Sequence, residues 1–323
     1  MLVPGMCALL AVALPALLIR LEIIDAYTAQ ILTLSAVNAI MALSVNMICG
    51  ITGQLSLGQA GFMAIGAYAT ILLSTNAHVP LPLSIVLAGI LTSFFGFLIG
   101  FPTLKLEGDY LAIVTLGFGE IIRVVLVNLK RWTGGPNGKQ FPTALALNPA
   151  LAYTVIVGTL VALIVLLQNF IRSTYGRAIL AVREDEIAAN AAGIDVFKYK
   201  MLGFVVASFV AGIGGALYAP FIGFVKPDQA SFTKSIDYLI FVVLGGMGST
   251  TGSVLAAFVL TYVQEFLRFL QNYRLLIYPV ILIIVMIFRP QGLMGMKEFS
   301  FVRTFDKIAS ILARGKKTEA HNG

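Results

Sequence analysis

The chain has 323 residues, of which 59% are hydrophobic and only 11% are charged. Soluble domains are typically about 45–50% apolar and about 25% charged, so these few charges could not cover a water-exposed surface. The net charge of +7 does not indicate nucleic-acid binding, because the basic residues lie in short segments between apolar runs. The composition therefore predicts an all-α polytopic membrane protein with the lipid bilayer as its outer solvent.

Ten apolar runs approach the roughly 20 residues that a membrane-spanning helix needs. The first run begins without Lys or Arg, so we expect a permanent span and not a cleaved leader. The segment 51–57 is apolar enough that 51–75 can be one interrupted helix, and a Gly-rich turn ends the run 234–249. The predicted spans are 2–19, 28–50, 58–75, 81–101, 107–128, 151–171, 201–222, 234–249, 250–269 and 275–289.

Ten crossings place both termini on one side of the membrane. More than half of the 22 basic residues then lie on that side, in the C-terminal tail, in the loop 172–200 and at Lys105. An excess of Lys and Arg marks the cytoplasmic side. We therefore expect a transmembrane domain over 1–290, a basic cytoplasmic tail over 291–323, and both termini in the cytoplasm.

A second group of basic residues runs against this rule. Lys130, Arg131 and Lys139 lie in the long loop 129–150, on the opposite side in the same count. The predicted orientation therefore depends on which side of the membrane has more basic residues, because neither side lacks them.

Two segments share a motif and predict an internal repeat. Residues 109–117 read DYLAIVTLG, and residues 237–245 read DYLIFVVLG. Three predicted crossings separate the two segments, so they would enter the membrane from opposite faces. Inverted repeats place a solute site near mid-membrane, between the two halves. If the two segments have a common origin, the chain has such a site. The alternative is that the two segments match by chance, since both are apolar.

Polar residues within the spans are candidates for a solute path. Asn38 and Asn46 are eight residues apart, so they share one face of the second helix, and Gln54, Ser56 and Gln59 follow. These side chains either form hydrogen bonds between helices or line the path. A polar but almost uncharged lining would suit the transient passage of a small zwitterionic or neutral solute.

The repeated segments add further candidates for the path. Asp109 and Asp237 lie near the ends of their runs, where each either caps a helix N-terminus or faces an interior cavity. Tyr110, Thr115 and Tyr238 belong to the same two segments. We include all five residues in the predicted path.

Glu120 and Arg123 lie inside the predicted span 107–128. They are three residues apart and therefore share a helix face. We expect a local ion pair, with the lining of a wet cavity as the alternative.

Motifs for catalysis are missing. The stretch 134–140 is the nearest approach to a P-loop, but Thr133 and Gln140 replace the first Gly and the final Ser or Thr. His78 and His321 are the only histidines, so neither a histidine-based metal site nor a catalytic one is expected. We expect the chain to move a solute without being an enzyme itself.

The loop 172–200 offers a place where an energy source could attach. Glu184 or Asp185 can start a short Ala-rich helix over 185–192, and Gly193 is well placed to end it. Such a helix is either a docking element or a solvated linker.

This loop resembles the E-A-A-x-x-x-G pattern of ATP-binding cassette (ABC) importer permeases, although Ile187 stands in the Glu position. More specific stretches are similar to the high-affinity branched-chain amino acid permease family, M-type subunit, over about 30–296. They are 53–62, 108–123, 133–138 and 289–295. Carried onto this sequence, the resemblance assigns coupling to ATPase subunits to Arg183, Glu184, Asp185, Glu186, Ala188, Ala189 and Gly193.

The resemblance implies import of leucine, isoleucine and valine across the bacterial plasma (inner) membrane. It implies a heterodimer with a sister permease, two ABC ATPase subunits and an extracytoplasmic solute-binding protein. ATP would be used by the partner subunits, and this chain would bind no cofactor or metal. Related permeases carry urea or short amides, and an ion-coupled secondary transporter fits the repeat equally well, so both remain alternatives.

Overall fold

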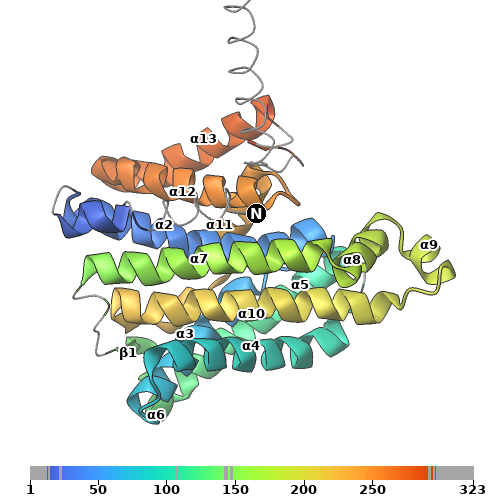
Figure 1. Cartoon of the computed structure of the whole chain (residues 1–323), viewed down its shortest axis with the longest axis horizontal. Helices are drawn as coiled ribbons and strands as arrows, with labels where there is room; N and C mark the ends of the chain where they lie inside the picture. The colour runs from blue at the N-terminus through green and yellow to red at the C-terminus, as the bar shows by residue number, and fades with distance from the viewer. Residues whose placement is uncertain are drawn as a thin grey trace, which may run out of the picture.

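The computed structural model describes residues 13, 15–21, 24–106, 108–141, 145, 148–289, 292, 293 and 295. Most of the predicted span 2–19 and nearly all of the predicted tail 291–323 lie outside the described residues. Within them the chain is almost entirely helical (Figure 1).

The long helices follow the predicted apolar runs closely. They are α2 (Ala26–Val45), continued by a π-helical turn (Asn46–Ile51), then α3 (Gln59–Thr75), α4 (Leu81–Thr103), α5 (Asp109–Asn128), α7 (Pro149–Arg172), α10 (Val196–Ile222), α11 (Phe232–Gly245), α12 (Thr250–Phe266) and α13 (Arg274–Phe288). Shorter elements connect them: α6 (Lys130–Thr133), α8 (Thr174–Glu184), α9 (Glu186–Ala191), the strands β1 (Lys139–Gln140) and β2 (Phe224–Val225), and 3-10 turns at Gly135–Asn137, Pro227–Ala230 and Leu267–Tyr273.

Six helices in the described part are long and apolar enough to cross a membrane. They begin at Ala26, Leu81, Asp109, Pro149, Val196 and Thr250. Helices α3, α11 and α13 are shorter, at 17, 14 and 15 residues. The prediction of an all-α, multi-pass membrane protein is confirmed, whereas the count of ten crossings stays a prediction.

Helices α2 and α10 form the centre of the bundle. Their most apolar windows are 83% and 72% buried, compared with 28% for α5. Figure 1 shows the axes of α2, α7, α10 and α4 lying nearly parallel, with α12 and α13 beyond α2. The central position of α2 and α10 explains why both are apolar around their whole circumference.

Close approach of α3 and α10 depends on glycine. A Cβ atom on Gly215 would lie 1.8 Å from the carbonyl oxygen of Met63, and one on Gly66 would lie 2.2 Å from that of Gly212. Without Cβ atoms the two backbones come into direct contact, which is a usual way to pack helices in lipid.

Both predicted interruptions are present. The chain leaves the helical path after the π-helical turn, runs without regular structure over 53–58, and starts α3 at Gln59. The second interruption separates α11 from α12, and there Gly246 and Gly248 take φ values of +105° and +91°. Such values favour glycine, so the Gly-rich sequence explains the turn.

The two copies of the predicted repeat occupy different parts of their helices. Asp109 is the first residue of α5, which has Gly108 as its N-cap. Asp237 lies beyond the first turn of α11, which has Ser231 as its N-cap. Neither aspartate is therefore the N-cap residue, although Asp109 lies in the first turn of α5, where the helix dipole favours a negative charge. The inverted repeat itself stays a prediction.

The bundle has two different ends. β1 pairs antiparallel with β2, with Lys139 opposite Val225, and this ribbon lies with α6 at one end. Helices α8 and α9 lie at the other end, where α9 projects beyond the bundle (Figure 1). The predicted coupling loop is thus separated from the ribbon by the length of the bundle.

Candidate functional site

A polar cluster lies where the interruption after α2 meets α5 and α11. It comprises Ser44, Gln54, Ser56, Gln59, Thr115 and Ser235, all of which are buried. The backbone N–H of Leu57 donates to Thr115 Oγ1 at 3.1 Å, and that of Ala60 donates to Ser235 Oγ at 3.2 Å. These bonds join the start of α3 to both neighbouring helices, and they bring Thr115 to the segment that carries Gln54, Ser56 and Gln59.

Two amide side chains in this cluster carry polar atoms that have no partner among the described residues. Gln59 Oε1 accepts from Ser44 Oγ at 2.9 Å, but no described residue bonds its Nε2. Neither Nε2 nor Oε1 of Gln54 has a partner among the described residues, and both are buried. Because most buried polar groups are hydrogen-bonded, three unpaired amide atoms at one interruption are consistent with passage of a polar solute.

Asn38 and Asn46 instead form hydrogen bonds between helices. Asn38 Nδ2 donates to Thr261 Oγ1 of α12 at 3.0 Å. Asn46 Oδ1 accepts from the backbone N–H of Gly248 at 2.8 Å, which ties the π-helical turn to the second interruption. Of the two interpretations of these asparagines, the contacts describe the structural one, and their place in the path stays a prediction.

The remaining path candidates are spread over the bundle. Asp109 and Tyr110 are exposed at the start of α5, with Tyr110 72% exposed, and do not reach the polar cluster. Asp237 pairs with Lys234 at 3.6 Å. Tyr238 is buried, and its hydroxyl donates to Met63 Sδ at 3.0 Å.

Glu120 and Arg123 form the predicted ion pair and hold a helix end as well. Arg123 Nε donates to Glu120 Oε2 at 2.7 Å, and Arg123 Nη1 lies 3.7 Å from Asp228 Oδ1. Glu120 Oε1 accepts from the backbone N–H of Phe232, the first residue of α11. The pair therefore anchors α11 to α5, a role that spacing within one helix could not reveal.

The predicted short helix in the loop 172–200 is confirmed as α9. Asp185 caps its start, since Oδ1 accepts from the backbone N–H groups of Ile187 and Ala188 at 2.9 and 3.0 Å. At its end Gly193 has φ +82°, its N–H bonds the carbonyl of Asn190, and the next N–H bonds that of Ala189. These two bonds form a Schellman motif, so both ends of α9 are fixed.

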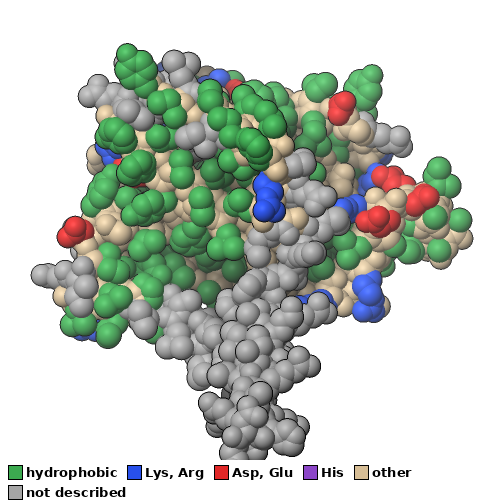
Figure 2. Space-filling model, turned by 90° about the horizontal axis from the view of Figure 1, so that it is seen from above, with side chains coloured by type: hydrophobic (Ala, Val, Ile, Leu, Met, Phe, Trp, Pro, Cys, Tyr) green, Lys and Arg blue, Asp and Glu red, His purple; other side chains and the backbone are tan. Residues whose placement is uncertain are grey.

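Helix α9 is an exposed knob on the end of the bundle. Ile187 is 84% exposed, Glu184 and Ala188 are exposed, and Ala189 faces inward. Figure 2 shows charged side chains gathering at this end, in contrast to the hydrophobic side chains over the rest of that face. Glu186 pairs with Lys200 Nζ at 2.5 Å and so fixes the knob to α10.

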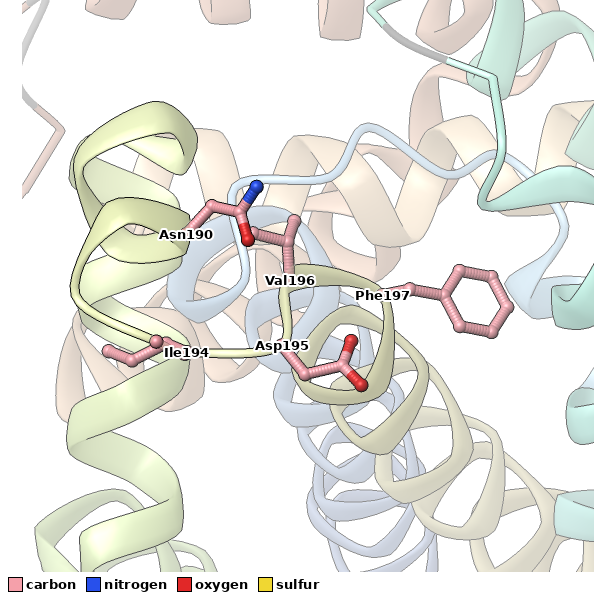
Figure 3. Close-up of a pocket in the computed structure, with 6 residues that line it drawn as sticks. Asn190, Ile194, Asp195, Val196 and Phe197 are labelled. Carbon is pink, nitrogen blue, oxygen red and sulfur yellow. The ribbon is translucent and has the colours of Figure 1, made fainter.

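A hollow of about 440 Å³ lies between the end of α9 and the start of α10 (Figure 3). It is lined by Asn190, Gly193, Ile194, Asp195, Val196 and Phe197. It is open to solvent and adjoins the knob.

Arg183 differs from the other predicted coupling residues. Its Nη1 donates to the carbonyl oxygen of Gly50 at 2.6 Å, and its side chain is only 22% exposed. It therefore points into the bundle and not toward the surface of the knob. Sequence alone did not indicate this direction.

An apolar helical bundle with two interruptions, unpaired interior amides and a capped, exposed knob defines a membrane transport subunit. Within the described ranges, no group of His, Cys, Asp or Glu could hold a metal ion. Residues 27–288 match the family model described as branched-chain amino acid transport system / permease component. The chain belongs to this family.

Individual relatives agree with the family match. The chain is 37% identical over 298 residues to the high-affinity branched-chain amino acid transport system permease protein LivM of Escherichia coli K12, covering 83% of this chain and 70% of the relative. It is 28% identical over 293 residues to the high-affinity branched-chain amino acid transport system permease protein BraD of Pseudomonas aeruginosa, covering 83% of this chain and 94% of the relative. It is 23% identical over 295 residues to LivH of Escherichia coli K12, covering 82% and 94%. No solved structure matches the chain.

This membership confirms the resemblance found in the motifs. It also confirms the expectation that the chain is a transport component of a membrane system and not an enzyme.

Proposed function

We propose that the chain is a permease subunit of an ABC importer that moves branched-chain amino acids into the bacterial cytoplasm. The observation that carries the proposal is the capped and exposed knob α9, in a chain whose residues 27–288 match the permease family. A rigid helix that projects from the bundle suits docking to a separate ATPase better than a solvated linker does.

The substrate class is supported by the relatives and by the polar cluster. The Escherichia coli and Pseudomonas aeruginosa relatives are both named as branched-chain amino acid permeases. Gln54 and Gln59 offer unpaired amide donors and an acceptor without a net charge. Such groups can bond the ammonium and carboxylate of a zwitterion in passing without holding it tightly.

A sister permease is supported by two observations. LivM and LivH of Escherichia coli are named as permease proteins of the same transport system, and both are similar to this chain. Glu120 and Arg123 lie within the span Asp109–Asn128, and their side chains are each 35% exposed. Because charged groups are costly against lipid, the exposed face of α5 is better covered by a second permease.

A binding protein is supported by the basic residues at the ribbon end. The pairing of β1 with β2 brings Lys139 near Lys226, and Lys130 and Arg131 lie in α6 at the same end of the bundle. Within the described part of the chain none of the four forms an ion pair. This group, the basic platform, lies at the opposite end from α9. An acidic face of an extracytoplasmic solute-binding protein complements it, which accounts for basic residues that oppose the orientation rule.

The full topology is part of the proposal. Six helices qualify as spans, and α3, α11, α13 and the predicted N-terminal span bring the count to ten. With the knob in the cytoplasm, both termini lie there too, and the chain crosses the bacterial inner membrane as an inverted repeat.

Co-purification tests the proposal. The tagged chain, extracted from its native membrane in mild detergent, is expected to bring a second permease and an ATPase pair. Charge reversal at both Glu184, the last residue of α8, and Glu186, on the knob, is expected to release the ATPases and leave the second permease bound. A chain that purifies alone and still catalyses uptake would overturn the proposal.

A further inference from the structure

The side chain of Arg183 enters the bundle from the last turn of α8. Its Nη1 donates a 2.6 Å hydrogen bond to the carbonyl oxygen of Gly50, within the π-helical turn that ends α2. Carbonyl groups at the end of a helix lack intrahelical partners and carry partial negative charge. A guanidinium is therefore a strong partner at this position, and the bond joins the coupling loop to the end of α2.

Glycine makes room for this side chain on two sides. A Cβ atom on Gly53 would lie 2.9 Å from Arg183 Cγ, and one on Gly248 would lie 3.4 Å from Arg183 Nη1. Gly53 belongs to the interruption after α2, and Gly248 belongs to the interruption between α11 and α12. Arg183 thus touches both interruptions at once.

The two interruptions are also bonded to each other. Asn46 Oδ1 accepts from the backbone N–H of Gly248 at 2.8 Å. A Cβ atom on Gly50 would lie 2.2 Å from Asn46 Oδ1 and 2.4 Å from the backbone nitrogen of Gly248. We call these four residues, Asn46, Gly50, Gly53 and Gly248, the junction.

The junction lies at one end of the irregular segment 53–58. Gly53 contacts Arg183, and Gly58 lies against the backbone of Thr115, whose Oγ1 accepts from Leu57. Residues 53–58 therefore run from the junction into the polar cluster that holds Gln54 and Gln59. A displacement of the junction would move the inner end of the proposed path.

We propose that Arg183 is a positioning residue that transmits movement of α8 and α9 to the junction. The inference rests on the proposed function, because ATPase subunits docked on α9 supply the movement. Asp185 connects the two helices directly, as the residue that ends α8 and caps α9. Displacement of α9 thus moves α8, and the Arg183 guanidinium shifts Gly50 and Gly248 together, so that the interruptions open or close as one unit.

The test uses the complete importer reconstituted in proteoliposomes with ATP and binding protein. Arg183→Gln is expected to keep the ATPase subunits bound and to keep ATP hydrolysis, while leucine taken up per ATP falls about tenfold, as for loss of a charged hydrogen bond. For Arg183→Lys, which keeps one charged donor group, leucine uptake per ATP is expected to lie between the values for Arg183→Gln and the unaltered importer. The matched control is Arg177→Gln on the same helix, whose guanidinium bonds the carbonyl of Arg172 at the end of α7 and not a residue of the junction.

A second pair of variants covers the case in which Arg183→Gln does not assemble. Gly53→Ala places a methyl group against Arg183 and is expected to uncouple hydrolysis from uptake. In the Arg183→Ala background the same change is expected to lower leucine uptake per ATP much less, because the Arg183 side chain is no longer there to be displaced. The strain from the positive φ of Gly53 is present in both backgrounds and so does not affect the comparison. Equal costs in the two backgrounds would overturn the proposal.

Two further outcomes separate this inference from the proposed function. Normal uptake per ATP in Arg183→Gln, or release of the ATPases by that variant, would overturn the positioning role alone. Failure of the unaltered complex to import any branched-chain amino acid would overturn the proposed function as well.

Discussion

Replacing Gln54 by methionine separates a functional polar group from a structural one. The Gln54 side chain has nearly the length of methionine, is 5% exposed, and has no partner for either polar atom among the described residues. Burial of an unpaired amide costs about 1–3 kcal/mol in mutational data. We therefore expect Gln54→Met to stabilise the folded protein by roughly 1 kcal/mol, and to slow uptake because a donor and an acceptor are lost from the path.

Two measurements on the same preparation check this prediction. A gain of this size raises the midpoint of thermal unfolding by about 2 °C in a chain of this length. Initial rates of leucine uptake by the reconstituted importer give the second quantity, and we expect them to fall.

Asn38→Leu is the matched control for stability. Asn38 Nδ2 bonds Thr261 Oγ1, so its loss removes a bond between α2 and α12 and is expected to lower the midpoint. A lower midpoint for Gln54→Met would mean that this amide is a structural group. Unchanged uptake would remove Gln54 from the path.

Three further predictions concern packing, the knob and the basic platform. Gly215→Ala forces α3 and α10 apart and is expected to destabilise the bundle by about 1–3 kcal/mol. Gly158→Ala, whose methyl group meets no atom within 4 Å apart from the nearby backbone of its own helix, should leave the midpoint of thermal unfolding unchanged or raise it slightly. Asp185→Ala removes two cap bonds and should weaken retention of the ATPases on a sizing column, with Asp185→Asn restoring it. Lys226→Glu should raise the concentration of binding protein needed for half-maximal ATP hydrolysis, because it reverses a charge on the basic platform. The increase should be smaller at high salt, which screens the charges. An unchanged concentration would refute docking of the binding protein at the platform.

Local features of the sequence predicted most of the fold. The apolar runs located the long helices to within a few residues, because lipid demands a minimum apolar length. The segment 51–57 and the Gly-rich turn at the end of the run 234–249 marked the two interruptions, and Asp185 with Gly193 marked both ends of α9. Each of these signals acts within a few residues along the chain.

Contacts between distant segments escaped prediction. The resemblance assigns Arg183 to coupling with ATPase subunits, and its contact with Gly50 could not be predicted, because the direction of a side chain depends on how α8 packs. Glu120 was expected to pair locally, and its second bond to the start of α11 depends on tertiary structure. The spacing of Asp237 from its helix start was also misjudged, because residues before the apolar run extend α11 to Phe232.

Transport by purified components tests the central claim most directly. Proteoliposomes that contain this chain, its sister permease and the ATPase pair are supplied with binding protein outside and ATP within. We expect leucine, isoleucine and valine to accumulate only when ATP and binding protein are both present, and the chain alone to accumulate none of them under a proton or sodium gradient. Accumulation by the chain alone under such a gradient, or import of urea in place of leucine, would contradict the account.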